Sequence, residues 1–270
     1  DIFMQLKKIN TFEKNKSLGQ HFLNDKNILK KILNIHEDLT SGTIIEIGPG
    51  MGSLTKEMLN KNAKIIAVEK DIRLKESLLI LKKSWPSNLE LIFGDALKID
   101  IPNLGNKPRR IIANLPYNIG TELLVRWLEK PKSFSSITVM LQKEVAERVI
   151  ANHKSKNYGR LSVLSGWHWN AKLVFTVKAK SFNPPPKVDS AIVYLAPKKE
   201  PVIPVNLNTL SKVTHALFSN RRKMIRSGLR KIGDPDIISS TTGIDISKRP
   251  QQLTIKEFCK IALFIEKKIK

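Results

Sequence analysis

Cysteine is almost absent from this sequence. The sequence also lacks the residue spacings of a zinc site and any long apolar run, and each of these absences bears on the class of protein. The 270 residues include one cysteine, Cys259, which excludes an internal disulfide. Neither Cys259 nor the five histidines show the paired spacing of a zinc site, so we expect no metal. The chain has no run of 18 apolar residues, and its first 20 residues contain no apolar stretch long enough for a signal peptide. We therefore expect a cytoplasmic protein without a membrane partner.

Acidic residues are also scarce, and they are distributed unevenly. The chain has 47 Lys and Arg against 24 Asp and Glu, a formal net charge of +23. Residues 148–188 and 201–233 contain no acid and carry 15 of the basic side chains. Such windows attract a polyanion, and the aromatic residues in the first window favour nucleic acid over lipid headgroups. Among these aromatics we expect Trp167, Trp169 and Phe175 to belong to the core.

From residue 43 onward, short apolar runs alternate with helical patterns, which is typical of a parallel sheet with crossover helices. We expect strands at 43–47, 64–69, 89–93, 110–113 and 136–141, and helices at 53–60, 72–83, 120–129 and 143–151. The strand runs are mostly apolar rather than alternating, which indicates an α/β fold with both sheet faces covered. Two further strands, 171–178 and 191–195, should close one edge of the sheet.

The pattern changes after Pro197, where prolines at 201 and 204 interrupt the chain. Beyond these prolines the sequence predicts helices alone, at 208–220, 222–231 and 255–267. We therefore expect two domains: an α/β domain over 1–196 with an N-terminal segment, and a small helical domain over 205–270. Nothing in the sequence suggests an obligate dimer, so we expect a monomer.

Glycines and acids follow the first three predicted strands. The first strand runs into Gly48-Pro49-Gly50-Met51-Gly52, whose small residues would let a ligand approach the backbone. The second strand ends at Glu69, which could accept both hydroxyls of a ribose, and the third is followed by Asp95, which could accept an adenine amino group. A tight turn, a solvated strand end and a helix cap are the alternatives. Together these residues describe a pocket for an adenosine moiety, as found in NAD and S-adenosylmethionine.

The fourth predicted strand leads into Asn114-Leu115-Pro116-Tyr117. The Asn114 side-chain oxygen and the Leu115 carbonyl could accept the two hydrogens of an exocyclic amino group, and Tyr117 could stack on the base that carries it. A proline turn with a core tyrosine is the alternative. Hydride transfer has no evident use for this cluster, and the glycine spacing is not the G-x-G-x-x-G of dinucleotide sites.

Six ordered motifs between about residues 15 and 231 resemble the ribosomal RNA adenine N6-dimethyltransferases, in particular the small-subunit enzymes. The motifs are GQHFL (19–23), EIGPGMGSLT (46–55), VEKD (68–71), GDAL (94–97), NLPYNI (114–119) and FNPPPKVDSA (182–191). The resemblance implies a Rossmann-like S-adenosylmethionine-dependent methyltransferase sheet with a small all-helical C-terminal domain. Two positions depart from the family pattern: His21 stands where asparagine is common, and Gly120 stands where serine is usual.

The resemblance also implies roles for individual residues. The residues expected to bind S-adenosylmethionine are His21, Leu23, Gly48, Gly50, Glu69, Asp95 and Asn114. Those expected to hold the target adenine are Asn114, Leu115, Pro116, Tyr117 and Phe182, with Phe182 stacking on the second face of the base. A core role beside the prolines is the alternative for Phe182. The implied reaction is methyl transfer to N6 of two adjacent adenines in a loop of small-subunit ribosomal RNA, during assembly of a pre-ribosomal particle.

The second acid-free window contains the residues expected to bind RNA phosphates: Arg221, Arg222, Lys223, Arg226 and Arg230. Residues 222, 226 and 230 would share one face of the predicted helix. Two alternatives to the small-subunit enzyme remain. One is a large-subunit adenine methyltransferase of the antibiotic-resistance type, and the other is a non-catalytic RNA-binding assembly factor on the same scaffold.

Overall fold

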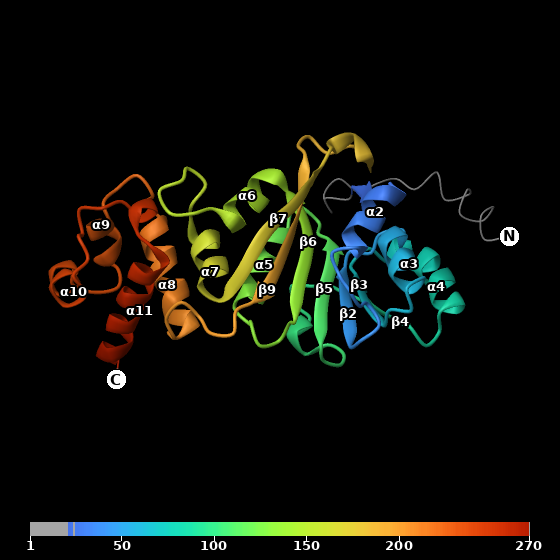
Figure 1. Ribbon diagram of the computed structural model, residues 1–270, viewed down its shortest axis with the longest axis horizontal. Coiled ribbons are helices and arrows are strands. Elements are labelled where there is room, and N and C mark those ends of the chain that lie inside the picture. Colours follow the sequence, from blue (N-terminus) through green and yellow to red (C-terminus); the bar gives the residue numbers. More distant parts are fainter. Residues whose placement is uncertain (1–20, 24, 270) are drawn as a thin grey trace. The chain divides into compact units, whose positions relative to one another are not determined.

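A seven-stranded sheet organises the α/β part of the chain in the computed structural model, which describes residues 21–23 and 25–269 (Figure 1). The strand order is β4-β3-β2-β5-β6-β9-β7. The strands are β2 (Thr43–Ile47), β3 (Ile65–Glu69), β4 (Leu89–Phe93), β5 (Arg109–Asn114), β6 (Ser136–Gln142), β7 (Trp169–Val177) and β9 (Ser190–Pro197). Strands β4, β3, β2, β5 and β6 are parallel, as predicted. The predicted edge pair is also confirmed, as β9 and β7.

The apolar strand runs are explained by burial on both faces of the sheet. All five residues of β2 and of β3 are buried, and Ile44, Ile65 and Ile112 of three adjacent strands belong to one hydrophobic core. From β2 the chain moves outward through β3 and β4, and then returns to place β5 on the other side of β2. This reversal creates a switch point at the carboxyl ends of β2 and β5, where ligands of open α/β sheets bind.

The predicted helices around the sheet are present, and one of them begins differently. The 72–83 segment starts as a 3₁₀ turn over Ile72–Leu74 and continues as α4. The helices from the first part of the chain are α2 (Lys26–Leu33), α3 (Ser53–Leu59), α4 (Lys75–Ser84), α5 (Gly120–Leu128) and α6 (Lys143–Ile150). Helix α2 was not predicted; Asp25 caps it by accepting the Asn27 and Ile28 backbone N–H groups.

Two short strands far apart in the sequence form a separate ladder. Strand β1 (Phe22–Leu23) pairs antiparallel with β8 (Phe182–Asn183), and Leu23 lies opposite Phe182. In the GQHFL motif, residues 19 and 20 lie outside the described residues.

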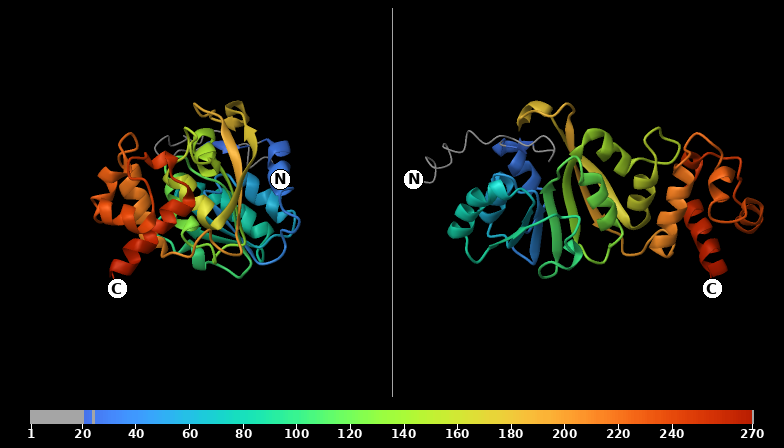
Figure 2. Two further views of the ribbon diagram at one scale, coloured as in Figure 1. Left: turned by 60° about the vertical axis from the view of Figure 1, so that its left-hand side comes forward. Right: turned by 180° about the vertical axis from the view of Figure 1, so that it is seen from behind.

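The chain divides into two compact units built from interleaved segments. The first comprises residues up to 124, 132–143 and 173–194, and the second comprises 125–131, 144–172 and 195–270. Within the described residues from 198 onward, every regular element is a helix (Figure 2). The bounds of the remaining helices are α7 (Arg160–His168), α8 (Leu207–Phe218), α9 (Ile225–Leu229), α10 (Pro235–Thr242) and α11 (Ile255–Ile269). The division of the chain at 196–204 stays a prediction.

The core of the second unit is aromatic and aliphatic. The rings of Phe218 and Phe258 stack at 5.4 Å, and Tyr158 meets Phe218 edge-on. Trp167 and Trp169 are buried, as expected, and their indole N–H groups donate to the Ile203 and Leu128 carbonyls.

Helices α7 and α10 were missed for different reasons. Seven of the nine α7 residues are buried, so the helix has no polar face to create a periodic pattern. Helix α10 is only eight residues long and depends on its ends, where Asp234 caps the first turn and Gly243 ends the helix with a φ of 70°.

Candidate active site

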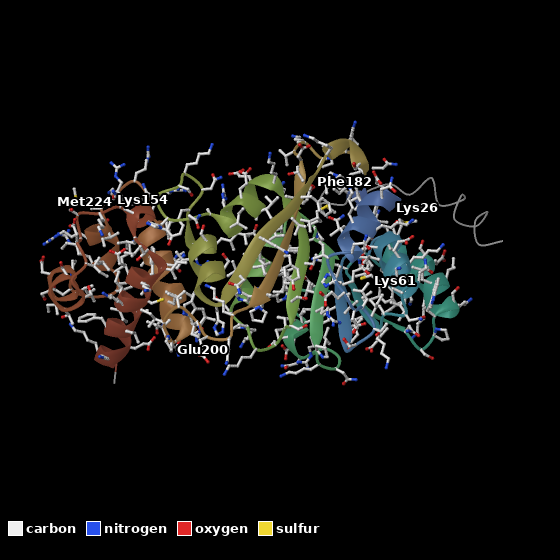
Figure 3. The ribbon with its side chains drawn as sticks, viewed as in Figure 1. Lys26, Lys61, Lys154, Phe182, Glu200 and Met224 are labelled. Atoms are coloured by element: carbon white, nitrogen blue, oxygen red, sulfur yellow. The ribbon has the colours of Figure 1, made fainter. Side chains whose placement is uncertain are left out.

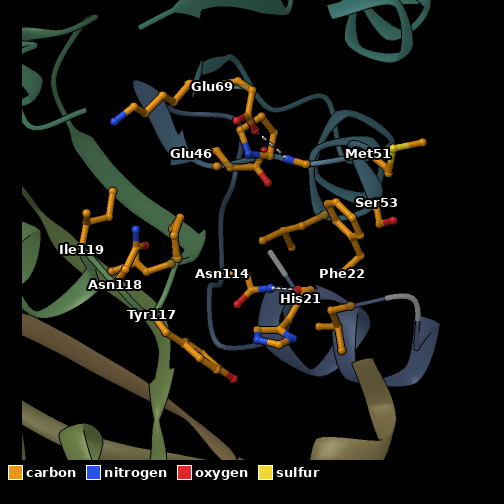
Figure 4. A pocket seen from close by; sticks show the side chains of 18 of the residues that line it. His21, Phe22, Glu46, Met51, Ser53, Glu69, Asn114, Tyr117, Asn118 and Ile119 are labelled. Carbon is orange, nitrogen blue, oxygen red and sulfur yellow. Dashed lines mark hydrogen bonds between the residues drawn. The ribbon is translucent and has the colours of Figure 1, made fainter. Parts of the chain in front are cut away.

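A cavity of about 110 Å³ opens at the switch point of the sheet (Figure 4). Its walls come mainly from β2 and the glycine turn that follows it, the start of α3, the end of β3, the end of β5 with the segment after it, and strand β1. The sequence-predicted residues that line it are His21, Leu23, Gly48, Gly50, Glu69, Asn114, Leu115, Pro116 and Tyr117. The fold therefore brings most of the predicted cofactor and adenine residues to one cavity. Asp95 and Phe182 are not among the lining residues.

The glycine turn is shaped so that only glycine fits. Gly48, Gly50 and Gly52 all have left-handed φ values, of 67°, 61° and 82°. A Cβ on Gly50 would lie 2.8 Å from the Phe22 ring, and one on Gly48 would lie 3.2 Å from Pro116. The turn thus brings bare backbone to the cavity wall, at the start of α3.

Glu69 is fixed by the backbone around it. Its two carboxylate oxygens accept the Gly50 N–H at 3.2 Å and the Asp71 N–H at 2.8 Å. The side chain is buried, and this desolvation raises the pKa of Glu69 above its usual value. The Lys70 backbone N–H also acts on this carboxylate, but its two oxygens offer four lone pairs, so it can still accept a hydroxyl from the cavity.

Asp95 lies outside the cavity lining and forms an ion pair with a residue that belongs to it. Lys70, which does line the cavity, places its ammonium 2.9 Å from one Asp95 oxygen, and the other oxygen accepts the Leu97 N–H at 3.0 Å. The hydrogen bond from Lys70 holds the pKa of Asp95 below its usual value. An adenine amino group would have to share this carboxylate with Lys70.

The Asn114 amide has a defined orientation. Its Nδ2 donates to the His21 carbonyl at 3.1 Å, which leaves the amide oxygen as an acceptor for another group (Figure 4). His21 is itself tied down, because its Nδ1 lies 2.9 Å from the Pro184 carbonyl oxygen. Strand β1 therefore fixes the orientation of a side chain that is distant in the sequence.

Tyr117 lines the cavity, and both its ring and its hydroxyl contact other residues. The ring centroid lies 5.2 Å from that of His21, and the hydroxyl shares a hydrogen bond with Oγ of Ser190, a fully buried residue at the start of β9. Burial raises the pKa of Tyr117 above its usual value, so the hydroxyl stays protonated. Ser190 was not predicted as a site residue.

Phe182 is placed differently from the sequence expectation. It is 4% exposed and packs in the hydrophobic core opposite Leu23 of β1. The two aromatic side chains expected to sandwich the adenine are therefore not brought together at the cavity in this structure.

Glu46 is the most unusual residue that the sequence analysis missed. It lies in the middle of β2, is 2% exposed and also lines the cavity. Its Oε2 accepts the Thr55 hydroxyl at 2.6 Å, and desolvation raises the pKa of Glu46 to about 8. The signal was available, because Glu46 is a single acid in the otherwise apolar run that precedes the glycine turn.

The five predicted RNA-contacting residues are not arranged as one helical face. Helix α9 covers only Ile225–Leu229, so Arg222 lies in the turn before it and the expectation of a shared face was wrong. Arg226 forms a bidentate ion pair with Asp236, with Nη1–Oδ1 and Nη2–Oδ2 distances of 2.9 and 2.7 Å. Arg222, Lys223 and Arg230 are exposed.

The described residues contain neither a metal site nor a membrane-spanning helix. No group of three or more His, Cys, Asp or Glu residues within 21–23 and 25–269 is arranged to hold a metal ion. No helix in the described part of the chain is long and apolar enough to cross a bilayer.

Comparison with known proteins gives a consistent picture. A family described as ribosomal RNA adenine dimethylase matches residues 11–267. A ribosomal RNA small subunit methyltransferase A from Azorhizobium caulinodans is 46% identical over 92% of this chain and 87% of its own length. One from Sinorhizobium fredii is 45% identical over 92% of this chain and 84% of its own length.

Solved structures agree with the sequence relatives. A dimethyladenosine transferase from Plasmodium falciparum superimposes with a TM-score of 0.79 at 29% identity, covering 92% of this chain and 98% of the other. The 23S rRNA methyltransferase ErmE gives a TM-score of 0.66 at 24% identity over 91% and 99% of the two chains, which shows the shared fold alone. The Rossmann-like methyltransferase fold is thus confirmed, and the chain belongs to the ribosomal RNA adenine dimethylase family.

Proposed function

We propose that this protein transfers methyl groups from S-adenosylmethionine to N6 of two adjacent adenines in small-subunit ribosomal RNA, as a monomer in the cytoplasm. Family membership supports an enzyme that methylates ribosomal RNA adenines, and the names of the Azorhizobium and Sinorhizobium relatives support the small subunit.

The cavity suits S-adenosylmethionine by shape and by charge. This cofactor carries a positive sulfonium, and Glu69 presents a buried carboxylate to the cavity, while the buried Glu46 presents a carboxyl group that holds its proton at neutral pH. The left-handed glycine turn brings bare backbone to the cavity wall, where a Cβ on Gly50 would instead lie 2.8 Å from the Phe22 ring. We assign Glu69 to the ribose hydroxyls, Asp95 to the adenine amino group, and Gly48, Gly50, His21 and Leu23 to the walls. When bound, the cofactor supplies an electrophilic methyl group.

The chain's own residues orient the nucleophile. The Asn114 oxygen and the Leu115 carbonyl are proposed to accept the two N6 hydrogens, which makes the nitrogen lone pair more available and aims it into the cavity. Tyr117 is proposed to stack on the base, with its ring fixed through Ser190. Pro116 is proposed to keep this segment extended beside the glycine turn, and the buried Phe182 could reach the base only if the β1–β8 ladder opens.

The single observation that carries the proposal is the Asn114 amide, whose nitrogen is bound by the His21 carbonyl so that its oxygen is the acceptor left for a substrate amine. RNA affinity is assigned to the basic residues Arg221, Arg222, Lys223 and Arg230, whereas the predicted contact of Arg226 is not carried over, because Arg226 is paired with Asp236. It should weaken steeply with salt, because binding to phosphates releases counterions.

The test uses methyl-labelled S-adenosylmethionine with immature small-subunit particles and, separately, with large-subunit RNA, followed by mapping of the label. We expect label on adjacent small-subunit adenines. Asn114→Ala should reduce transfer by at least roughly 100-fold, the scale of losing one oriented catalytic hydrogen bond, while cofactor binding stays measurable. Asn103→Ala, which alters an exposed asparagine, is the matched control. Label on large-subunit RNA, or no label with intact RNA binding, would contradict the proposal.

A further inference from the structure

Two loops of the second unit are joined into one surface by hydrogen bonds that involve the backbone. We define this two-loop surface as residues 152–157 and 220–225. The Arg221 guanidinium donates to the Lys156 carbonyl, which links the loops directly. Each loop is also tied to the 248–251 segment: the Lys154 N–H donates to the Gln251 carbonyl and the Ile225 N–H to the Lys248 carbonyl, both at 2.8 Å. The two acid-free windows of the sequence therefore meet in space.

The charge of this surface is available to a partner. Neither loop contains an acid, and Lys154, Lys156, Arg222 and Lys223 are exposed. Arg226 differs, since Asp236 neutralises it through two hydrogen bonds. Lys154 also holds a left-handed φ of 70°, and its N–H bond to Gln251 keeps the loop in that conformation. The basic side chains are thus displayed on ordered backbone.

Met224 adds an apolar group to the same surface. Its side chain is 56% exposed, whereas the next residue, Ile225, is 1% exposed and anchors the turn (Figure 3). An isolated exposed apolar residue needs no explanation by itself. Here it stands directly after Arg222 and Lys223, and flexible apolar side chains that flank phosphate-binding residues can pack on base or sugar faces. A lipid surface would require a larger apolar face than this one side chain.

We propose that the two-loop surface binds structured RNA, with Lys154 and Lys156 contacting phosphates alongside Arg222 and Lys223, and with Met224 packing on a base or ribose. This inference rests on the proposed function and extends it to residues outside the predicted RNA set. It also removes Arg226 from that set, because binding a phosphate would require breaking its pair with Asp236.

The experiment measures binding to protein-free small-subunit ribosomal RNA, transcribed in vitro, over a series of KCl concentrations. The slope of log affinity against log salt concentration reports the number of phosphate contacts, because each contact contributes about 0.7–0.9 to its magnitude. The double variant Lys154→Asn, Lys156→Gln should lower this slope by about 1.4–1.8 and weaken binding roughly 30-fold at about 0.1 M salt. Asparagine is chosen at position 154 because it tolerates a left-handed φ.

Three further variants separate charge from apolar contact. Arg226→Gln removes the same charge as each lysine variant and should leave the slope unchanged. Met224→Ala should weaken binding by a similar factor, about fivefold, at every salt concentration, consistent with loss of roughly 1 kcal/mol of stacking, and Met224→Leu should restore most of it. Circular dichroism spectra confirm that each variant is folded.

The outcomes are distinguishable from failure of the proposed function, because methyl transfer is assayed on the same preparations. A wild-type protein that methylates RNA, with lysine variants that keep the wild-type slope, would overturn this inference alone. The inference would also be overturned if Arg226→Gln lowered the slope by about 0.7–0.9, the change expected for one lost phosphate contact, or if the wild type bound equally well to anionic vesicles. A wild-type protein that shows the expected slopes but never transfers methyl groups would overturn the proposed function and leave the RNA surface standing.

Discussion

The protonation state of Glu46 provides the most specific test of the site, because burial of its carboxyl group raises the pKa. The residue is 2% exposed in a strand buried on both faces, and its carboxyl group is hydrogen-bonded by the Thr55 hydroxyl. At neutral pH most of the protein should carry Glu46 in its protonated form, since the pKa of Glu46 is raised to about 8. Glu46→Gln keeps the shape and an acceptor for Thr55, but cannot ionise.

The size and sign of the effect follow from proton linkage. The folded protein holds this proton more tightly than the unfolded chain, where the pKa of a glutamate is near 4.5. The stabilisation is therefore fully present below pH 4.5 and is lost as the pH rises through 8. The difference in pKa corresponds to about 5 kcal/mol in total, or about 1.4 kcal/mol for each pH unit between the two values.

The assay is urea unfolding of the wild type and of Glu46→Gln at a series of pH values from about 5.5 to about 7.5, inside the window between the two pKa values. Subtracting the two curves removes every other titrating group. The wild type should lose about 2.7 kcal/mol relative to the variant across this range. Glu90→Gln, which alters an exposed glutamate of β4, should follow the wild type. A flat difference between the wild type and Glu46→Gln would show that Glu46 does not hold a proton in the folded state.

Three further predictions concern the cavity walls. Ser190→Ala should raise KM for RNA and lower turnover by releasing the Tyr117 ring, and it should have no further effect in a Tyr117→Phe background; additive losses in a double-mutant cycle would contradict this coupling. Gly50→Ala should lower the free energy of unfolding by about 1–2 kcal/mol, because of its left-handed φ, and should displace the Phe22 ring, so thermal melting and cofactor titration should both change. Lys70→Met should change the affinity for S-adenosylmethionine by no more than about fivefold, since an exposed ion pair contributes roughly 0–1 kcal/mol; a larger loss in calorimetry would mean that Lys70 contacts the cofactor itself.

The parallel sheet was predictable because its determinants are local. Strands such as Ile65–Glu69 are mostly apolar runs, and only a sheet covered on both faces buries such runs fully. The glycines after Ile47 likewise marked a sharp turn before a helix. The order of the motifs along the chain then placed their side chains at one edge, because the carboxyl ends of parallel strands share that edge.

Helix periodicity predicted helices less well where burial or the residues at the helix ends determine the structure. Helix α7 has no polar face, and α9 covers only Ile225–Leu229, with Gly228 packed so closely that a Cβ there would lie 2.8 Å from the Ala216 carbonyl oxygen. The sequence predicted that the basic residues share one helical face, whereas in the structure Arg222 and Lys223 lie in a turn.

By itself, then, the sequence determined the fold class, the motif order and the family to which the chain belongs. Only the tertiary structure decided that Phe182 is buried against Leu23, that Asn114 is oriented by the His21 carbonyl, and that Arg221 joins two loops. These contacts join residues 65 to 159 positions apart. Periodicity and propensity describe neighbours along the chain, whereas such contacts, and the ionisation of Glu46, depend on what long-range packing places around each group.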